Sequence, residues 1–351
     1  MKKLLCLLLA AMMLLLCVSC GTGKGDDQTS DESSSQPTSE SESESENETE
    51  KLAVNVYVIT GPTGIGAVHM WNESEEHKGT YDYRFTAVTT PTEVVSKLSK
   101  GEADIAAIAT NLAAKVYKAT EKGVKVIAVN TLGVLNVLTK DGPQITSWND
   151  LKGRKVVTTG QGANPEFIIR YLMNKNGVDP DNDLTIEYKA EGTELVTVWA
   201  KEPEAVIIAP QPVATAILKK YEGSSIAMDL TEEWKKADPD SQLMMGCVVV
   251  RTEFLNAHPE AVEDFLSDYE KSVKAANDDP AATAELCVKY GIVAQAPVAQ
   301  AAIPHCHITF VTGEEMKAGL DGYLRVLLEA DASSIGGSMP DDDFYYNGKA
   351  E

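Results

Sequence analysis

Short runs of β-branched and aromatic residues alternate with longer stretches of helical periodicity after residue 50. Residues 54–60 predict a strand, and the glycine-rich turn at 61–66 leads into a helix. The same order recurs later, with a strand at 155–159, a turn at 160–162 and a helix over 164–175. Strands that alternate with amphipathic helices are typical of an α/β protein whose mostly parallel sheets are flanked by helices.

Two apolar stretches, 125–139 and 242–250, bracket the second set of strand and helix units. We expect them to be strands that cross between two lobes and leave a cleft there. The first lobe then comprises 51–138 together with 245–351, and the second comprises 139–244. Three late helices, at 259–276, 280–290 and 314–330, are expected to complete the first lobe, and the acidic tail after residue 340 to pack as an irregular strap.

The N-terminus has the pattern of a secretory signal. Lys2 and Lys3 precede an apolar run over residues 4–16, and Ser19 precedes Cys20. A membrane-spanning helix needs about 20 apolar residues, and this run is shorter. We therefore expect residues 1–19 to be removed as a bacterial lipoprotein signal peptide. Lipid on Cys20 would then hold the exported protein to the outer side of the cell membrane.

Residues 21–50 carry ten acidic side chains, one Lys and no aliphatic or aromatic residue. Such a segment cannot bury apolar surface, so residues 20–50 are predicted to be a disordered spacer behind the lipidated Cys. The whole chain has a net charge of −22, and no basic stripe with aromatic residues occurs. Nucleic acid is therefore not expected as a partner.

Motifs for catalysis or metal binding are weak. The turn at 61–66 lacks the Gly-Lys-Ser/Thr ending of a phosphate-binding loop, and no Gly-x-Ser-x-Gly, His-Glu-x-x-His or Cys-x-x-Cys occurs. His305 and His307 flank Cys306 without obvious further ligands, so we expect no metal site and no cofactor. The remaining cysteines of the body, Cys247 and Cys287, are predicted to be reduced like Cys306, with Cys247 in the core.

Several segments, in their order and spacing, resemble one family of transport proteins. They include GPTGIGAVHMW, KGEADIAAIATNLAAKVY, DLKGRKVVTTGQGANPEF, IIAPQPVATAIL, SQLMMGCVVV and IPHCHITFVTGEEM. The resemblance is to the solute-binding lipoproteins of bacterial ABC importers. Their fold is the type II periplasmic-binding-protein fold, and the branch is that of the thiamine-pyrimidine-precursor, taurine and aliphatic-sulfonate binding proteins. The resemblance covers residues 52–346 of this chain.

This resemblance implies a two-lobed binder, of the Venus-flytrap kind, that closes on a small solute and docks on a membrane permease served by a separate ATPase. We expect a monomer without enzymatic activity. Two other functions remain open: a lipoprotein that senses a ligand without transport, and an exported enzyme on the same fold.

Ligands in open α/β sheets bind beyond the carboxyl ends of the strands, so we expect the ligand-binding residues in the loops there. The glycines can also be explained by tight turns alone, Asn111 and Asn164 can equally be helix caps, and Met245 can equally be core. Trp71 is a candidate for stacking on a ring. None of the five arginines after residue 50 falls in these loops, which favours backbone capture of a sulfonate or amide pairing with a nitrogen heterocycle. The full candidate set is Thr63, Gly64, Trp71, Thr110, Asn111, Thr131, Gly160, Gln161, Asn164, Glu166, Gln211 and Met245.

Overall fold

A computed structural model describes residues 51–348 except for residues 77 and 142–144. The predicted signal peptide, Cys20 and the acidic spacer lie outside the described residues. Within the described part no helix is long and apolar enough to cross a bilayer.

The first sheet contains six of the described strands, in the order β11-β4-β10-β3-β1-β2. β10 runs antiparallel between β3 and β4, whereas β1 pairs in parallel with both β2 and β3. The strands are β1 (Ala53–Ile59), β2 (Asp82–Val88), β3 (Ile105–Ala109), β4 (Val124–Thr131), β10 (Gly246–Arg251) and β11 (Ile308–Val311).

The second sheet contains five described strands, in the order β7-β6-β8-β5-β9. β6 pairs in parallel with β7 and β8, and β5 runs antiparallel to β8 and β9. Both sheets are thus mixed rather than mostly parallel. The chain enters the second sheet with β5 and returns to the first sheet with β10, and each of these strands runs antiparallel to its neighbours. The strands are β5 (Leu135–Lys140), β6 (Lys155–Thr159), β7 (Thr185–Lys189), β8 (Val206–Pro210) and β9 (Ser224–Asp229).

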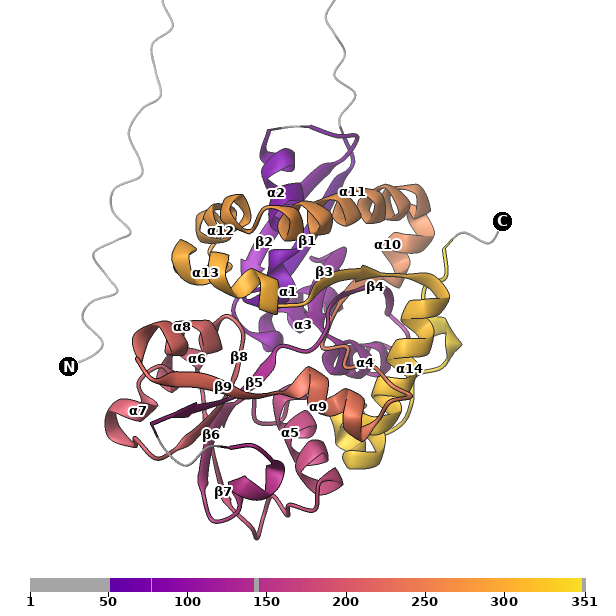
Figure 1. Cartoon of the computed structure of the whole chain (residues 1–351). Helices are drawn as coiled ribbons and strands as arrows, with labels where there is room; N and C mark the ends of the chain where they lie inside the picture. Colours follow the sequence, from indigo (N-terminus) through magenta and orange to yellow (C-terminus); the bar gives the residue numbers. More distant parts are fainter. Residues whose placement is uncertain (1–50, 77, 142–144, 349–351) are drawn as a thin grey trace, which may run out of the picture. The chain divides into compact units, whose positions relative to one another are not determined.

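Helices cover both faces of each sheet, as the ribbon drawing shows (Figure 1). The longer ones are α2 (Val68–Glu75), α3 (Pro91–Ser99), α4 (Thr110–Ala119), α5 (Asn164–Lys175), α8 (Val213–Lys220), α9 (Leu230–Ala237), α11 (Pro259–Asp278), α12 (Pro280–Lys289) and α14 (Gly313–Ala330). The shorter ones are α1 (Pro62–Ile65), α6 (Gly192–Leu195), α7 (Val198–Lys201), α10 (Thr252–Ala257) and α13 (Ala296–Ala302), with 3-10 turns η1 (Trp148–Leu151), η2 (Ile303–His305), η3 (Ala332–Ile335) and η4 (Asp342–Phe344). The two-lobed α/β fold class is confirmed.

Alternating side chains divide the core into layers. Ile105 and Ala107 of β3 join the cluster under α2, α11 and α12, whereas Ala106 and Ile108 join the cluster on the opposite face. That second cluster continues across one face of the second sheet, where Ile208 of β8 belongs to it. This second cluster therefore spans both sheets. An aromatic series extends it, because Tyr171 of α5 contacts Trp234 of α9, which contacts Tyr323 of α14.

Helix starts differ in how they are capped. Thr90 accepts a hydrogen bond from the Glu93 amide at the start of α3. Thr312 makes no side-chain cap at α14. Asn111 does not open α4, because the helix begins at Thr110 after an extended Ala109.

The apolar stretch 125–139 is not one strand. It divides into β4 in the first sheet and β5 in the second, so the chain changes sheets at 132–134. The boundary expected between residues 138 and 139 falls inside β5. Likewise β10 begins at Gly246, and 242–245 is irregular. We call 131–134 and 242–245 the crossing segments.

The C-terminal strap is held to the first sheet by backbone and side-chain bonds. Tyr346 donates its amide to the Val126 carbonyl at 2.9 Å, and Lys125 donates to the Asp343 carbonyl at 2.8 Å. The three cysteines of the described chain, Cys247, Cys287 and Cys306, are free thiols and buried.

The edge strand β7 of the second sheet carries a charge cluster. Glu187 of β7 is paired with Lys155 and with Lys189. These lysines, through hydrogen bonds and then charge, lower the pKa of Glu187 to about 2. The carboxylate is therefore stabilised in its ionised form in the folded protein.

Candidate functional site

The two crossing segments are hydrogen-bonded to each other and to the end of β3. Met245 donates its amide to the Thr131 carbonyl at 3.0 Å. The Met245 carbonyl accepts from the Thr110 amide at 3.1 Å, and the Thr110 hydroxyl donates to the Met244 carbonyl at 2.7 Å. Three candidates that are far apart in sequence are thus brought together where the chain passes between sheets.

Asn164 joins this group from the second sheet. Its Nδ2 donates to the Met245 carbonyl at 3.0 Å and lies 3.5 Å from the Thr110 hydroxyl. The side chain is 2% exposed. Asn164 is the first residue of α5, and its side chain makes no cap, so the capping alternative is wrong. It instead links the two sheets directly.

Gln211 follows β8 and touches the first crossing segment. Its amide donates to the Val134 carbonyl at 2.9 Å, and it precedes Pro212 through a cis peptide bond. Its Oε1 accepts from the Thr215 amide at 3.2 Å and from the Thr215 hydroxyl at 2.7 Å. The side chain is 1% exposed, so this glutamine is a fixed part of the junction.

The glycine turn after β1 is tied to the same junction through Asn130. Asn130 Nδ2 donates to the Thr63 carbonyl at 3.0 Å, and the Thr131 hydroxyl donates to Asn130 Oδ1 at 3.2 Å. Gly64 is needed for close packing, because a Cβ there would lie 2.9 Å from the Ile59 carbonyl oxygen. Thr63 and Gly64 therefore lie beside Thr131.

Sequence reasoning missed Asn130, although a signal was present. It is a polar residue directly after the apolar run 126–129 of β4, and it is 1% exposed. Its Nδ2 also contacts the hydroxyl of Tyr269 at 3.0 Å. A buried amide among aliphatic residues needs such partners to offset its desolvation.

Gly160 and Gln161 form the turn before α5. Gly160 has φ of 80°, and a Cβ there would lie 2.6 Å from Pro165 Cγ, so only glycine fits. Gln161 is exposed. The turn therefore sets the position of Asn164, while the Gln161 side chain lies at the surface.

Two candidates lie outside the junction. Asn111 Nδ2 donates to the Ser334 carbonyl at 3.3 Å, which ties α4 to η3. Trp71 stacks between Phe85, at a ring-centroid distance of 5.4 Å, and Tyr290, at 4.3 Å. Both side chains have structural partners of their own.

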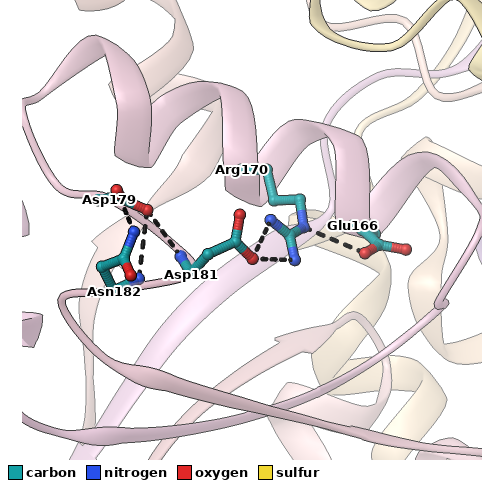
Figure 2. Close-up of polar contacts among 5 residues, drawn as sticks. All are labelled: Glu166, Arg170, Asp179, Asp181 and Asn182. Atoms are coloured by element: carbon teal, nitrogen blue, oxygen red, sulfur yellow. Dashed lines mark hydrogen bonds and ion pairs between the residues drawn. The ribbon is translucent and has the colours of Figure 1, made fainter.

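Glu166 lines a cavity of about 630 Å³ beside α5. Figure 2 shows Arg170 between Glu166 and Asp181. Arg170 Nε donates to Glu166 at 3.1 Å, and both terminal nitrogens donate to one oxygen of Asp181 at 2.9 and 3.0 Å. Glu166 also accepts from the Gly162 amide at 2.7 Å. The other lining residues include Lys115, Phe167, Tyr171, Asn174, Asp179, Pro180, Ala330, Asp331 and Ser333.

This cavity has the volume of a small-molecule site, but several of its charged side chains are already paired within the protein. Asp179 accepts from Asn182 Nδ2 at 2.8 Å and from the Asp181 amide at 2.9 Å (Figure 2). These bonds, the Asn182 side chain first, hold the pKa of Asp179 below its usual value. Of the predicted residues only Glu166 lines the cavity.

The His305-Cys306-His307 segment forms no metal centre. His305 is exposed and Cys306 is buried, whereas the His307 ring contacts the Gly133 carbonyl. Across the described ranges no group of three or more His, Cys, Asp or Glu side chains is placed to hold a metal ion.

Comparisons with known proteins identify the family. The family model described as NMT1/THI5 like matches residues 81–283, which is more than half of the chain. No curated protein sequence matches the chain.

Solved structures with the same fold come from several organisms. An ABC transporter structure from Parabacteroides distasonis is 20% identical, with a TM-score of 0.69, and the match covers 84% of this chain and 98% of that one. The periplasmic aliphatic sulphonate binding protein SsuA from Escherichia coli is 12% identical, with a TM-score of 0.69 and coverage of 85% and 92%. The periplasmic nitrate-binding protein NrtA from Synechocystis PCC 6803 is 12% identical, with a TM-score of 0.61 and coverage of 82% and 84%.

The family match agrees with the resemblance in the sequence, and the structural matches agree with the two mixed sheets flanked by helices. The chain therefore belongs to the NMT1/THI5-like family and has the fold of the periplasmic binding proteins of ABC transporters.

Proposed function

We propose that this protein is the solute-binding lipoprotein of an ABC importer. It captures a small solute between its lobes and delivers it to a permease whose ATPase is a separate protein. The observation that carries the proposal is the buried polar junction, in which Thr110, Thr131, Asn164 and Met245 meet from both sheets. Proteins of the same fold described as sulphonate-binding and nitrate-binding support it.

The position of the junction favours binding at the interface of the lobes. The expected lobes are 51–138 with 245–351, and 139–244. Asn164 is held across their interface by the Met245 carbonyl, so a change in the angle between the lobes must alter that bond. A solute at this place is therefore coupled to closure, which is how a binder signals its loaded state to a partner. We propose that the protein works as a monomer and binds without catalysis.

The solute is proposed to be a thiamine-type pyrimidine, a sulfonate or a similar small molecule. A thermal-shift screen of pyrimidines, sulfonates and amino acids tests this proposal on the purified chain. A solute at one hundred times its dissociation constant stabilises the native state by about 2.7 kcal/mol, which is a shift of several degrees. No shift with any of these classes would contradict the proposal.

Two variants test where the solute binds. Gln161→Ala and Asn111→Ala should each weaken the affinity for a confirmed solute if the loops after β6 and β3 contact it. Unchanged affinity in both would show that the solute contacts neither side chain. Gln300→Ala, at an exposed position of α13, is the control and should not change the affinity.

The lipid anchor is proposed at Cys20, after removal of residues 1–19, with 20–50 as the spacer. Cys20→Ser should release the protein from the membrane fraction of expressing cells, whereas the natural chain should stay with it. Membrane retention of Cys20→Ser would contradict lipidation at this residue.

A further inference from the structure

His307 has a backbone conformation that non-glycine residues rarely adopt. Its φ angle is 47°, in the left-handed region that favours glycine. The other described non-glycine residues with a positive φ, Glu121, Lys122 and Asp141, are exposed, whereas His307 is half-buried. Such a conformation persists only where the surrounding structure holds it, and it is found most often at functional sites.

The residues on either side of His307 are anchored in the first lobe. Cys306 and Ile308 are buried in the cluster under α2, α11 and α12. Asn277 of α11 also donates its side-chain amide to the Ile308 carbonyl at 2.9 Å. The backbone of His307 is therefore fixed to the first lobe from both sides.

From this position His307 contacts the first crossing segment with two groups. Its carbonyl accepts from the Leu132 amide at 3.2 Å, and its ring Nδ1 contacts the Gly133 carbonyl. A carbonyl oxygen only accepts hydrogen bonds, so Nδ1 carries a hydrogen and donates it. Ring and backbone together hold residues 132 and 133 to the first lobe.

The next residue of the crossing segment is held by the second lobe. The Val134 carbonyl accepts from the Gln211 amide at 2.9 Å. The attachment of the chain thus changes from one lobe to the other between Gly133 and Val134. Because both flanks are hydrogen-bonded, a rotation of one lobe against the other must be taken up by the few backbone torsions at this place.

We propose that His307 is a positioning residue that sets the angle between the lobes by holding Gly133 in the conformation seen here. In this conformation Asn164 is bonded to Met245 across the lobes, so His307 favours the arrangement in which the lobes are joined. The inference rests on the proposed function for its purpose, since the angle between the lobes matters through the capture of a solute. It gives His307 a role other than metal binding.

Hydrogen exchange of the purified, solute-free chain, followed residue by residue, tests the proposal. His307→Gly removes the ring donor and accepts the left-handed backbone without strain. We expect the Leu132 amide to exchange about tenfold faster in this variant, because the segment loses one of its two bonds to His307. The Gln211 amide should become faster too, because its bond joins the second lobe to the same place. The Tyr346 amide, bonded to Val126 elsewhere in the first sheet, should keep its natural rate.

Two further variants show whether the ring donor is responsible. His307→Asn tolerates the left-handed backbone and offers a side-chain N–H to the Gly133 carbonyl, so it should restore both rates to within about threefold of the natural ones. His305→Asn, at an exposed position two residues earlier, is the matched control and should change neither rate.

Natural exchange rates at Leu132 and Gln211 in His307→Gly would overturn the inference. Faster exchange at Leu132 alone would also overturn it, because the contact would then act only locally. An equal increase at Tyr346 would do the same, since it would show a general loosening of the fold. Because no solute is present, these outcomes leave the proposed function standing, and a failed solute screen would leave the role of His307 standing.

Discussion

The first crossing segment is packed too tightly to accept one added methyl group, and Gly133→Ala tests this directly. A Cβ at Gly133 would lie 2.2 Å from Thr231 Oγ1 and 2.7 Å from Leu243 Cδ2. Both neighbours are buried, so neither can move into solvent. The φ angle of Gly133 is not in the left-handed region, so the expected effect is steric.

The magnitude follows from two opposing terms. Overpacking of a filled core costs about 1–3 kcal/mol, whereas Gly→Ala at a compatible backbone gains about 0.4–1 kcal/mol through the unfolded chain. We therefore expect Gly133→Ala to lower the free energy of unfolding by about 1–2 kcal/mol. Urea unfolding followed by tryptophan fluorescence measures it.

A double-mutant cycle assigns the loss to Thr231. Thr231→Ala removes the closest atom, and because its hydroxyl is buried without a partner, the single change should be nearly neutral. The double variant should then recover at least about 0.5 kcal/mol relative to the sum of the single effects. Gly322→Ala in α14 is the control, since its Cβ would meet Ser241 at an ordinary 3.4 Å. It should be neutral or stabilising.

Wild-type stability of Gly133→Ala would refute the reasoning. So would a double variant whose loss equals the sum of the single losses, because the contact with Thr231 would then contribute nothing.

Three further predictions concern the surface and the residues outside the junction. The lowered pKa of Glu187 means that its ionised form adds stability above its unfolded pKa, about 4.3, and that this contribution disappears as pH falls toward 2. Glu187→Gln should thus lose less stability than the natural chain between pH 5 and 2 in urea titrations, and an equal loss would contradict the pairing. Asn111→Ala should lower the free energy of unfolding by about 1 kcal/mol through the lost bond to Ser334, and a thermally unchanged variant would argue against that bond. Trp71→Ala should cost about 2–3 kcal/mol by removing the stacked ring, and calorimetric unfolding at wild-type temperature would show that the stack is unimportant.

The pattern of apolar residues predicted the elements that bury continuous faces. β1 and β6 were found within one residue, because short β-branched runs between turns have few other solutions. It missed β9, in which only one residue is fully buried, and α9, since neither has a long apolar run. The apolar pattern also predicted β4 and β5 as one stretch, because the sequence of a strand does not show which sheet the strand joins.

The candidate site shows the same division between local and tertiary information. The rule for strand ends selected Thr110, Asn164 and Gln211, whereas their hydrogen-bond partners in the crossing segments lie up to 135 positions away in the sequence. Asn111 and Asn164 illustrate the limit, since both are asparagines at a helix start. One is bonded to η3 and the other crosses to Met245.

By itself the sequence determined the α/β class, the alternation of buried faces and the family resemblance, because these depend on composition and local period. Only the tertiary structure decided which sheet each strand joins and which polar groups meet at the crossing segments. The physical reason is that the hydrogen-bond partner of a buried amide is the group that lies next to it in the folded protein, which need not be near it in the sequence. Asn164 and Gln211 acquire their partners only when two sheets and two crossing segments are in place.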